Sequence, residues 1–314
     1  MNSSVKRDNP RILITGAKGQ LGSELAAMLN NGYFTGVFDN ISLFLTDQAE
    51  LDITDRDQVI SFVTGNSIDV IINCAAYTAV DKAEDEPGVC MAVNRDAPAN
   101  LAAAAKASNA LLMHISTDYV FDGRGPLPYN EDDLRAPASV YGLSKEAGET
   151  SLEESGARFV IIRTSWLYSR FGNNFVKTIA RLANEKEKLE VVYDQIGTPT
   201  CAEDLANAIL VICRDYLLWS TTRYSFPYGI YHYSNEGVCS WYDFAVEIVR
   251  LIGSQCVVEP VLSARFPSKA KRPPYSVLDK QKIKNTFGLK ISHWKKSLEV
   301  SSGKYLSSYK IVRP

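Results

Sequence analysis

The sequence predicts an α/β fold, with a Rossmann-type doubly wound parallel sheet covered by helices on both faces and a smaller C-terminal α/β domain. Three observations lead to this prediction. Short apolar runs alternate with helix-length segments through the first half of the chain, which is the pattern of parallel strands joined by right-handed crossovers. Beyond residue 163 the rhythm becomes irregular, and 314 residues exceed the usual size of one domain.

The expected strands are short apolar runs rich in β-branched residues. They cover residues 11–15, 41–45, 70–74, 111–115 and 159–162. The expected helices have apolar residues at helical spacing or a run of alanines. They cover residues 21–29, 94–107, 140–150, 174–184, 202–214 and 241–252. The proline-rich stretch 266–275 is expected to be a loop.

The composition excludes several classes of protein. With 46% hydrophobic and 22% charged residues, the chain suits a globular protein rather than a disordered one. A formal net charge of −2 provides no general field for nucleic acid, so no nucleic-acid partner is expected. The six cysteines lack the spacing of a zinc site or a disulfide scaffold. No apolar run reaches the roughly 20 residues of a membrane span, so we expect no membrane partner and a cytoplasmic protein.

Three glycines, Gly16, Gly19 and Gly22, lie between the first expected strand and the first expected helix. A dinucleotide pyrophosphate binds at such a place, because exposed N–H groups of the helix point toward it. The glycines allow a tight turn, a close approach of phosphate to backbone, and close packing of helix on strand. The expected phosphate-binding loop comprises Gly16, Lys18, Gly19, Gln20, Leu21 and Gly22.

An acidic residue at the end of the second strand normally binds the adenosine ribose hydroxyls, and Asp47 is the candidate. It lies farther along the chain than the usual spacing of about 20 residues, which requires an insertion around residues 32–40. Asp52 and Ile53 are expected to flank the adenine. Asp47 disfavours a 2′-phosphate by repulsion whereas Lys18 attracts one, so the sequence leaves NADH and NADPH open.

The motif positions suggest how the chain divides. We expect residues 1–165 and about 190–232 to form a dinucleotide-binding domain. Residues from about 166 to 189 and from 233 to 314 are expected to form a substrate domain. A cleft between two such lobes suits a small-molecule ligand.

Tyr141 and Lys145 lie four residues apart in an expected helix, so both side chains project from one face. A neighbouring ammonium favours the phenolate, which predicts a Tyr141 pKa below its usual value of about 10 and a useful general acid. About one such pair is expected by chance in a chain with 16 tyrosines, so the pair needs support. Thr117 supplies it, because it follows strand 111–115 at the edge where doubly wound sheets bind ligands.

Several segments resemble the extended short-chain dehydrogenase/reductase superfamily and, within it, the dTDP-4-dehydrorhamnose reductase family. They are ITGAKGQLG (14–22), LDITD (51–55), NCAAYTAVDKAE (73–84), STDYVFDG (116–123), VYGLSKEAGE (140–149), RTSWLY (163–168), GNNF (172–175), GTPT (197–200) and RPPYSVLD (272–279). The resemblance covers nearly the whole chain.

The resemblance implies an NAD(P)H-dependent oxidoreductase in which Thr117, Tyr141 and Lys145 are catalytic and Lys145 also binds the nicotinamide ribose. Hydride would pass to C4 of a keto sugar while Tyr141 protonates the alkoxide and Thr117 orients the oxygen. The implied substrate is the sugar nucleotide dTDP-4-dehydro-6-deoxy-L-mannose and the implied product is dTDP-L-rhamnose. The nucleotide and the ring stereochemistry are left open.

The resemblance also implies further contacts. Ala75, Ala76 and Tyr77 would border the cofactor, and Asn94 would support the lysine. The residues expected at the substrate are Thr117, Asp118, Tyr119, Trp166 and Asn174. Some relatives dimerise through magnesium held by glutamates, and Glu24 and Glu203 stand in suitable motifs. Surface carboxylates are the commoner reading of such residues, so no metal is predicted, and a homodimer is left open.

Related activities are disfavoured by the residues after the threonine. Sugar-nucleotide 4,6-dehydratases need an Asp-Glu pair there, whereas Asp118 is followed by Tyr119, and 4-epimerases usually carry a different segment. A non-catalytic alternative is kept, because the regulatory subunit of eukaryotic methionine adenosyltransferase resembles this reductase family and acts by binding its partner. The intact set of Thr117, Tyr141 and Lys145 favours the enzyme.

Overall fold

A six-stranded parallel sheet forms the centre of the molecule. The computed structural model describes residues 9–38, 40–219 and 225–306. The strands are β1 (Arg11–Thr15), β2 (Ser42–Thr46), β3 (Val70–Asn73), β4 (Leu111–Thr117), β5 (Arg158–Thr164) and β10 (Gly229–His232). Their order across the sheet is β10-β5-β4-β3-β1-β2, and the pairings are parallel. The doubly wound fold is therefore confirmed.

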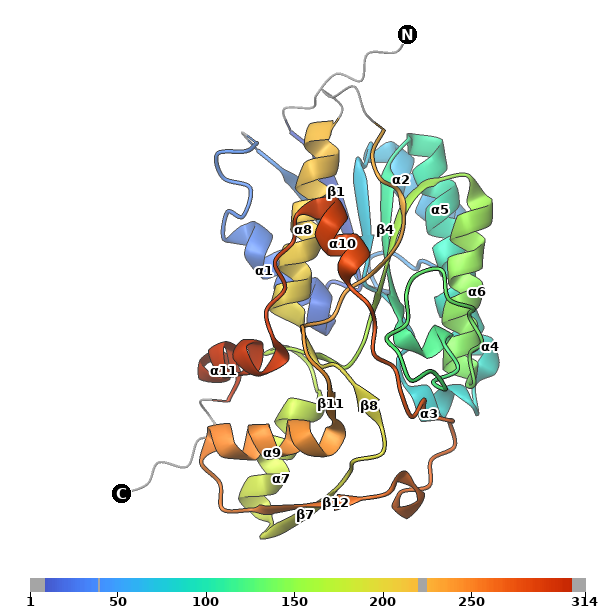
Figure 1. The fold of residues 1–314 in the computed structure, drawn as a ribbon. Helices are drawn as coiled ribbons and strands as arrows, with labels where there is room; N and C mark the ends of the chain where they lie inside the picture. Colours follow the sequence, from blue (N-terminus) through green and yellow to red (C-terminus); the bar gives the residue numbers. More distant parts are fainter. Residues whose placement is uncertain (1–8, 39, 220–224, 307–314) are drawn as a thin grey trace.

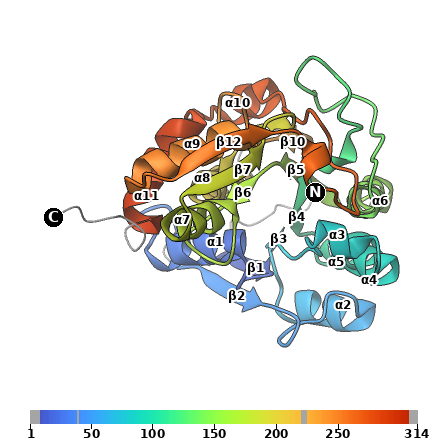
Figure 2. The same ribbon diagram turned by 90° about the horizontal axis from the view of Figure 1, so that it is seen from below.

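Helices cover both faces of this sheet (Figures 1 and 2). On one face lie α1 (Gln20–Asn30), α8 (Ala202–Trp219) and α10 (Gln281–Phe287), and on the other lie α2 (Arg56–Gly65), α5 (Ala97–Ser108) and α6 (Val140–Ser155). Successive side chains of a strand point to opposite faces. Ile12 and Ile14 accordingly join the core beneath α1 and α8, whereas Leu13 joins the core beneath α2 and α5.

A second, smaller lobe lies below the sheet in Figure 1. Its helices are α7 (Phe175–Glu185), α9 (Trp241–Ile252) and α11 (Trp294–Tyr305), and its main strands are β7 (Lys188–Val192) and β12 (Val257–Val261), paired in parallel. Phe244, Trp294 and Leu298 are buried in its core. The remaining elements are α3 (Val80–Ala83), α4 (Pro87–Met91), η1 (Ala92–Asp96), η2 (Asp118–Val120), β6 (Leu167–Tyr168), β8 (Ile196–Gly197), β9 (Thr200–Cys201), β11 (Cys239–Ser240) and η3 (Ser263–Arg265).

The expected strands and helices are confirmed with small shifts at their ends. β4 continues to Thr117, so this threonine is the last residue of the strand. The stretch 94–107 divides between the π-helical turn η1 and helix α5, and 266–275 lacks helices and strands as expected. The strands β7, β10 and β12, the two-residue strands, and the helices α2 and α11 were not anticipated. The strands are too short to show a clear periodicity.

The expected domain boundaries stay a prediction, and two elements lie across them. β7 begins at Lys188 and pairs with β12 of the second lobe, although residues from about 190 were expected in the first. α10 falls within 233–314, yet its Ile283 is buried in the core of the sheet.

The insertion before Asp47 folds back onto the sheet. Phe34 and Phe38 are buried, and their rings meet edge-on at 5.6 Å. The hydroxyl of Tyr33 donates a hydrogen bond of 2.8 Å to the amide oxygen of Asn207 on α8. β2 therefore begins late in the chain yet pairs with β1 along its whole length, with Asp47 directly after it.

A buried ion pair joins α6 to β5. The Arg163 guanidinium donates to Glu149 at 2.7 Å, and the two side chains are 1% and 0% exposed. Arg163 also donates to Nε2 of His232 on β10 at 3.2 Å. A charge buried this deeply is tolerated only while its partner neutralises it.

The six cysteines are free thiols, five of them buried and Cys74 half-buried, as their scattered spacing predicts. Within the described ranges, no helix combines the length and the hydropathy needed to cross a membrane.

Glu149→Leu is expected to lower the free energy of unfolding by roughly 3–5 kcal/mol, because it leaves the Arg163 guanidinium buried without its carboxylate. The matched control is Glu185→Leu, which breaks the half-exposed Arg181–Glu185 pair on α7. Such a pair contributes about 0.3–0.5 kcal/mol. Urea unfolding of both variants measures the contrast, and equal losses would contradict the importance given to the buried pair.

Candidate active site

The loop between β1 and α1 approaches the chain after β3 very closely. Gly16 has a φ of +66°, and a Cβ at this position would lie 2.6 Å from the backbone nitrogen of Ala75. A Cβ at Gly22 would lie 2.3 Å from the carbonyl oxygen of Gly16. Gly19 is the N-cap of α1 and offers no side chain to cap it. The first N–H groups of α1 are therefore free to meet an anion.

A cavity of about 410 Å³ opens beside this loop. Eight of the residues expected at the cofactor line it, namely Gly16, Gly19, Asp47, Asp52, Ile53, Ala75, Ala76 and Tyr77. The other lining residues were not expected from the sequence, and they are Thr15, Thr46, Gln48, Leu51, Thr54, Cys74, Val89 and Val93. Thr15 and Thr46 end β1 and β2, so a search of strand ends would have found them.

The other expected cofactor residues do not line this cavity. Lys18 is exposed, and its ammonium pairs with Glu50 at 2.9 Å instead of standing free for a 2′-phosphate. Its backbone N–H donates to Asp47 at 2.8 Å, so Asp47 also holds the loop in place. Leu21 is buried in the core, which leaves only its backbone for an anion, and Gln20 accepts a hydrogen bond from Asn174 at 3.0 Å.

Asn94 is buried between two elements that carry site residues. Its amide oxygen accepts from the Tyr77 N–H at 2.9 Å, and its nitrogen donates to the Tyr77 carbonyl at 3.0 Å and to the Ser144 hydroxyl at 3.0 Å. The expected support of the lysine is thus indirect in this structure, because Asn94 bonds the neighbour of Lys145.

Thr117, Tyr141 and Lys145 meet at the carboxyl end of β4. Ser139 caps α6 by accepting from the Gly142 N–H at 3.1 Å, and this orients the first turn, which carries Tyr141. The Thr117 hydroxyl lies near the Tyr141 hydroxyl, and it acts to lower the Tyr141 pKa. Lys145 is 1% exposed, and its Nζ donates to the Ile115 carbonyl at 2.7 Å.

The expected lowering of the Tyr141 pKa is wrong for this structure. Burial raises the pKa of Tyr141, and the hydrogen bond from Thr117 opposes only part of the rise. The physical reason is burial, which disfavours the charged phenolate, while the nearby Asp118 carboxyl acts in the same direction. The Nζ of Lys145 bonds to the Ile115 carbonyl and lies 3.2 Å from Nε2 of His114. Tyr141 therefore remains protonated at neutral pH and is available as a general acid.

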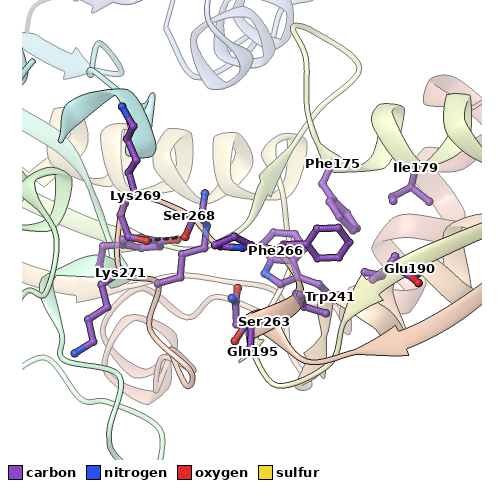
Figure 3. Close-up of a pocket in the computed structure, with 17 residues that line it drawn as sticks. Phe175, Ile179, Glu190, Gln195, Trp241, Ser263, Phe266, Ser268, Lys269 and Lys271 are labelled. Atoms are coloured by element: carbon purple, nitrogen blue, oxygen red, sulfur yellow. Dashed lines mark hydrogen bonds between the residues drawn. The ribbon is translucent and has the colours of Figure 1, made fainter. Parts of the chain in front are cut away.

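A larger cavity of about 850 Å³ lies against the second lobe (Figure 3). Tyr119 lines it, and the Tyr119 ring meets that of Tyr141 edge-on at 5.5 Å. The rest of its wall comes from the second lobe and was missed. It comprises Phe175, Ile179, Glu190–Val192, Gln195, Trp241, Ser263, Ala264 and Phe266–Arg272. Phe175 and Arg272 carried a signal, through their segments GNNF and RPPYSVLD.

Trp166 and Asn174, both expected at the substrate, lie behind the wall of this cavity. Trp166 has a φ of +47° and stacks on the lining residue Trp241, with ring centroids 3.6 Å apart. Asn174 caps α7 by accepting from the Lys177 N–H at 3.1 Å. Their observed contacts hold the wall in place, and contact with a substrate stays a prediction.

Asp118 is a buried carboxyl beside the three central residues. It is 2% exposed and accepts a hydrogen bond of 3.1 Å from Thr117, while its Oδ2 has no hydrogen-bond partner among the described residues. Burial raises its pKa to about 6, and the nearby hydroxyls of Ser276 and Thr117 oppose part of this rise. Burying an oxygen without a hydrogen bond costs free energy, so this carboxyl is suited to bind a ligand that donates the missing hydrogen bond.

The two glutamates considered for magnesium are paired with cations. Glu24 is fully buried, accepts from the Ser169 hydroxyl at 2.8 Å and lies 3.3 Å from Arg170. Glu203 pairs with Lys304 at 2.7 Å. Over the described part of the chain, no cluster of three or more metal-binding side chains occurs.

The chain is similar to known proteins along almost its whole length. The family model described as RmlD substrate binding domain matches residues 10–306. The dTDP-4-dehydrorhamnose reductase of Aggregatibacter actinomycetemcomitans is 43% identical over 296 residues, which cover 92% of this chain and 97% of that protein. The corresponding reductase of Escherichia coli is 37% identical, with 90% and 94% covered.

Two solved structures are similar in fold and in sequence. A dTDP-4-dehydrorhamnose reductase of Clostridium acetobutylicum has a TM-score of 0.85 and 42% identity, covering 96% of this chain and 100% of that chain. The reductase of Bacillus anthracis, solved in complex with NADP, has a TM-score of 0.84 and 39% identity, covering 96% and 99%.

Gly22→Ala is expected to weaken dinucleotide binding about tenfold or more, because its Cβ would push the Gly16 carbonyl and the loop out of place. Gly65→Ala is the control, since a Cβ there meets nothing within 4 Å. Fluorescence titration with NADPH and NADH measures the dissociation constants. Unchanged affinity in folded Gly22→Ala would show that the close approach is not needed.

Asp118→Asn is expected to stabilise the ligand-free protein above pH 6 and to have little effect below pH 4. The folded-state pKa of Asp118 is about 6, whereas an unfolded aspartate has a pKa of about 3.9. The free energy of unfolding of the unsubstituted protein therefore falls by roughly 2–3 kcal/mol as the pH rises from about 4 to above about 6. The variant, which cannot ionise, avoids this loss. Unfolding free energies from pH 4 to 8 test this, and parallel profiles for the two proteins would refute it.

Proposed function

The chain belongs to the RmlD substrate binding domain family, and we propose that it reduces the C4 ketone of dTDP-4-dehydro-6-deoxy-L-mannose with NADPH or NADH, giving dTDP-L-rhamnose. The observation that carries this proposal is the meeting of Thr117, Tyr141 and Lys145 at the end of β4. Tyr119 of the larger cavity touches Tyr141 on one side. On the other side, Cys74 lines the smaller cavity and lies near Lys145.

The smaller cavity suits a nicotinamide dinucleotide. The first turn of α1 has no side-chain cap, and the glycines beside it leave no room for a Cβ. Both features suit the binding of a pyrophosphate close to the backbone. Asp47 would bind the adenosine ribose, Asp52 and Ile53 would flank the adenine, and Ala75 to Tyr77 would border the rest of the molecule. When bound, the reduced nicotinamide supplies a hydride.

Tyr141 acts as the acid in this proposal. Because burial raises the pKa of Tyr141, the hydroxyl is protonated at neutral pH and can give its proton to the alkoxide formed at C4. Thr117 holds the same oxygen, since its hydroxyl lies beside that of Tyr141. The buried carboxyl of Asp118 and the ring of Tyr119 are adjacent to this point and would contact the sugar.

The larger cavity suits the nucleotide part of the substrate. Figure 3 shows Phe175 and Trp241 close together on its wall, with ring centroids 4.6 Å apart, and these rings offer a stacking surface. Lys269, Lys271 and Arg272 line the same cavity. Lys269 pairs with Asp85 at 2.5 Å, so Lys271 and Arg272 are the cations that would attract a diphosphate. Arg272 is anchored because its guanidinium donates to Asp81 at 2.6 Å and 3.2 Å.

We also propose the expected division into dinucleotide and substrate domains, and a cytoplasmic location.

The direct test is to mix the protein with enzymatically prepared dTDP-4-dehydro-6-deoxy-L-mannose and NADPH or NADH, and to follow the nicotinamide absorbance. Oxidation of either cofactor that depends on the sugar supports the proposal. If folded protein oxidises neither cofactor, the reductase proposal fails and the non-catalytic alternative gains support.

Tyr141→Phe is expected to abolish turnover, by about 100-fold or more, while cofactor affinity stays within about twofold, because only the acidic hydroxyl is removed. Tyr193→Phe is the control, since Tyr193 is 47% exposed. Steady-state rates and cofactor titrations check both variants. Near wild-type turnover in Tyr141→Phe would exclude Tyr141 as the acid.

A further inference from the structure

The short helix α3 connects two parts of the site that are far apart in the chain. It lies next to the first turn of α6, which carries Tyr141, and next to the loop that carries Arg272 (Figure 1). None of residues 80–86, all of which the structure describes, lines either of the two cavities. Carboxyl groups in and directly after α3 nevertheless bond to both of these neighbours.

The side chain of Glu84, which follows the last residue of α3, holds the start of α6. Its Oε1 accepts a hydrogen bond of 2.9 Å from the backbone N–H of Val140, the first residue of α6. The first N–H groups of a helix have no partner within the helix, so they need an acceptor from outside. Ser139 accepts from Gly142 at 3.1 Å in the same turn. Tyr141 therefore lies between two residues whose N–H groups are held by side chains.

Asp81, three residues before Glu84, holds the loop of the larger cavity. Its two oxygens accept from the Arg272 guanidinium at 2.6 Å and 3.2 Å, and Oδ1 also accepts from the N–H of Ala270 at 3.2 Å. The Arg272 guanidinium holds the pKa of Asp81 below its usual value, so Asp81 is a carboxylate at neutral pH. Two parallel bonds fix the orientation of a guanidinium as well as its position, and they leave its other N–H groups for a ligand.

The backbone around Arg272 is held on both sides. Ala270 is buried and bonded to Asp81. On the other side, a Cβ at Gly123 would lie 2.4 Å from Cβ of Pro273, so the chain after η2 packs directly against this proline. Arg272 is therefore fixed through its backbone and through its guanidinium.

The segment that contains α3 is itself held in place. The backbone N–H and carbonyl of Tyr77 bond to the side chain of Asn94 at 2.9 Å and 3.0 Å. The hydroxyl of Tyr77 donates to Glu86 at 2.9 Å, which joins the two ends of residues 77–86. Ala83 between them is fully buried. Asp81 and Glu84 are therefore carried by one segment with little freedom to move.

We propose that α3 fixes the span between the acid and the cation that binds the diphosphate, with Glu84 and Asp81 as positioning residues for Tyr141 and Arg272. The proposal rests on the proposed function, in which Tyr141 serves C4 of the sugar and Arg272 serves the diphosphate. Arg272 lies near Tyr119, whose ring meets that of Tyr141 at 5.5 Å, so the cation and the acid are close together. The ligand that matches this span is a nucleoside diphosphate with a single hexose attached to it.

Three alanine substitutions in the same segment test the two positioning roles. Asp81→Ala, Glu84→Ala and Asp85→Ala each remove one carboxyl group. Asp85→Ala is the matched control, because Asp85 forms an exposed pair with Lys269 on the same loop as Arg272. Glu84→Gln is the conservative variant, since its amide oxygen can still accept from the Val140 N–H.

The two positions are expected to affect different constants. Asp81→Ala should weaken the binding of dTDP, and raise the KM of the keto sugar nucleotide, by about fivefold or more while kcat stays within about twofold. Glu84→Ala should lower kcat by about fivefold or more while dTDP affinity stays within about twofold, and Glu84→Gln should restore kcat. Asp85→Ala should change neither constant by more than about twofold. Calorimetric titration with dTDP and steady-state rates measure these effects in the full-length protein.

Tighter dTDP binding by Asp81→Ala would show that Asp81 competes with the diphosphate, and this would overturn the proposal. Similar losses in all three alanine variants, or a kcat that Glu84→Gln does not restore, would also overturn it.

A readout without turnover separates this inference from the proposed function. Hydrogen exchange of the Val140 amide should be about tenfold faster or more in Glu84→Ala than in the unsubstituted protein, because the amide loses its acceptor. If the unsubstituted protein does not reduce the sugar, the proposed function fails. The dTDP titrations and the exchange rates then still decide the two positioning roles, and unchanged values in Asp81→Ala and Glu84→Ala would overturn them.

Discussion

The position of α6 against the sheet is the constraint on which the site depends. A Cβ at Gly142 would lie 2.4 Å from the carbonyl oxygen of Tyr119, and one at Gly148 would lie 2.1 Å from that of Asn94. Helix α6 therefore contacts neighbouring backbone at two positions along its length. The buried ion pair of Glu149 and Arg163 fixes its distance from β5. Helix contacts this close leave Tyr141 and Lys145 little freedom. The acid is held at the end of β4 by packing rather than by a loop.

Much of the fold could be predicted from the sequence, because the parallel strands and their helices have local apolar patterns. Gly16, Asp47 and Tyr141 could likewise be recognised, since each follows a strand or begins a helix at a characteristic place. The walls of the larger cavity could not be predicted. Phe175, Trp241 and the loop containing Arg272 are distant in the chain, and no local pattern indicates that they meet.

The pKa of Tyr141 shows a different limit of sequence reasoning. Helical spacing correctly places Lys145 on the same face of α6, but spacing does not say where the ammonium or amine group bonds. In the structure Nζ is bonded to Ile115 and lies beside His114, both on β4, which no spacing rule connects to α6. The sign of a pKa shift depends on these contacts and on burial, so it follows from the fold and not from the motif.

The central claim is that this site moves hydride to C4 of a sugar ketone, and an isotope experiment tests it most directly. The protein is incubated with the keto sugar nucleotide and with NADPH carrying deuterium on the transferring face of the nicotinamide. The account predicts one deuterium at C4 of the product, seen by mass spectrometry and NMR. Product without deuterium, deuterium at another carbon, or no product from folded protein would contradict it.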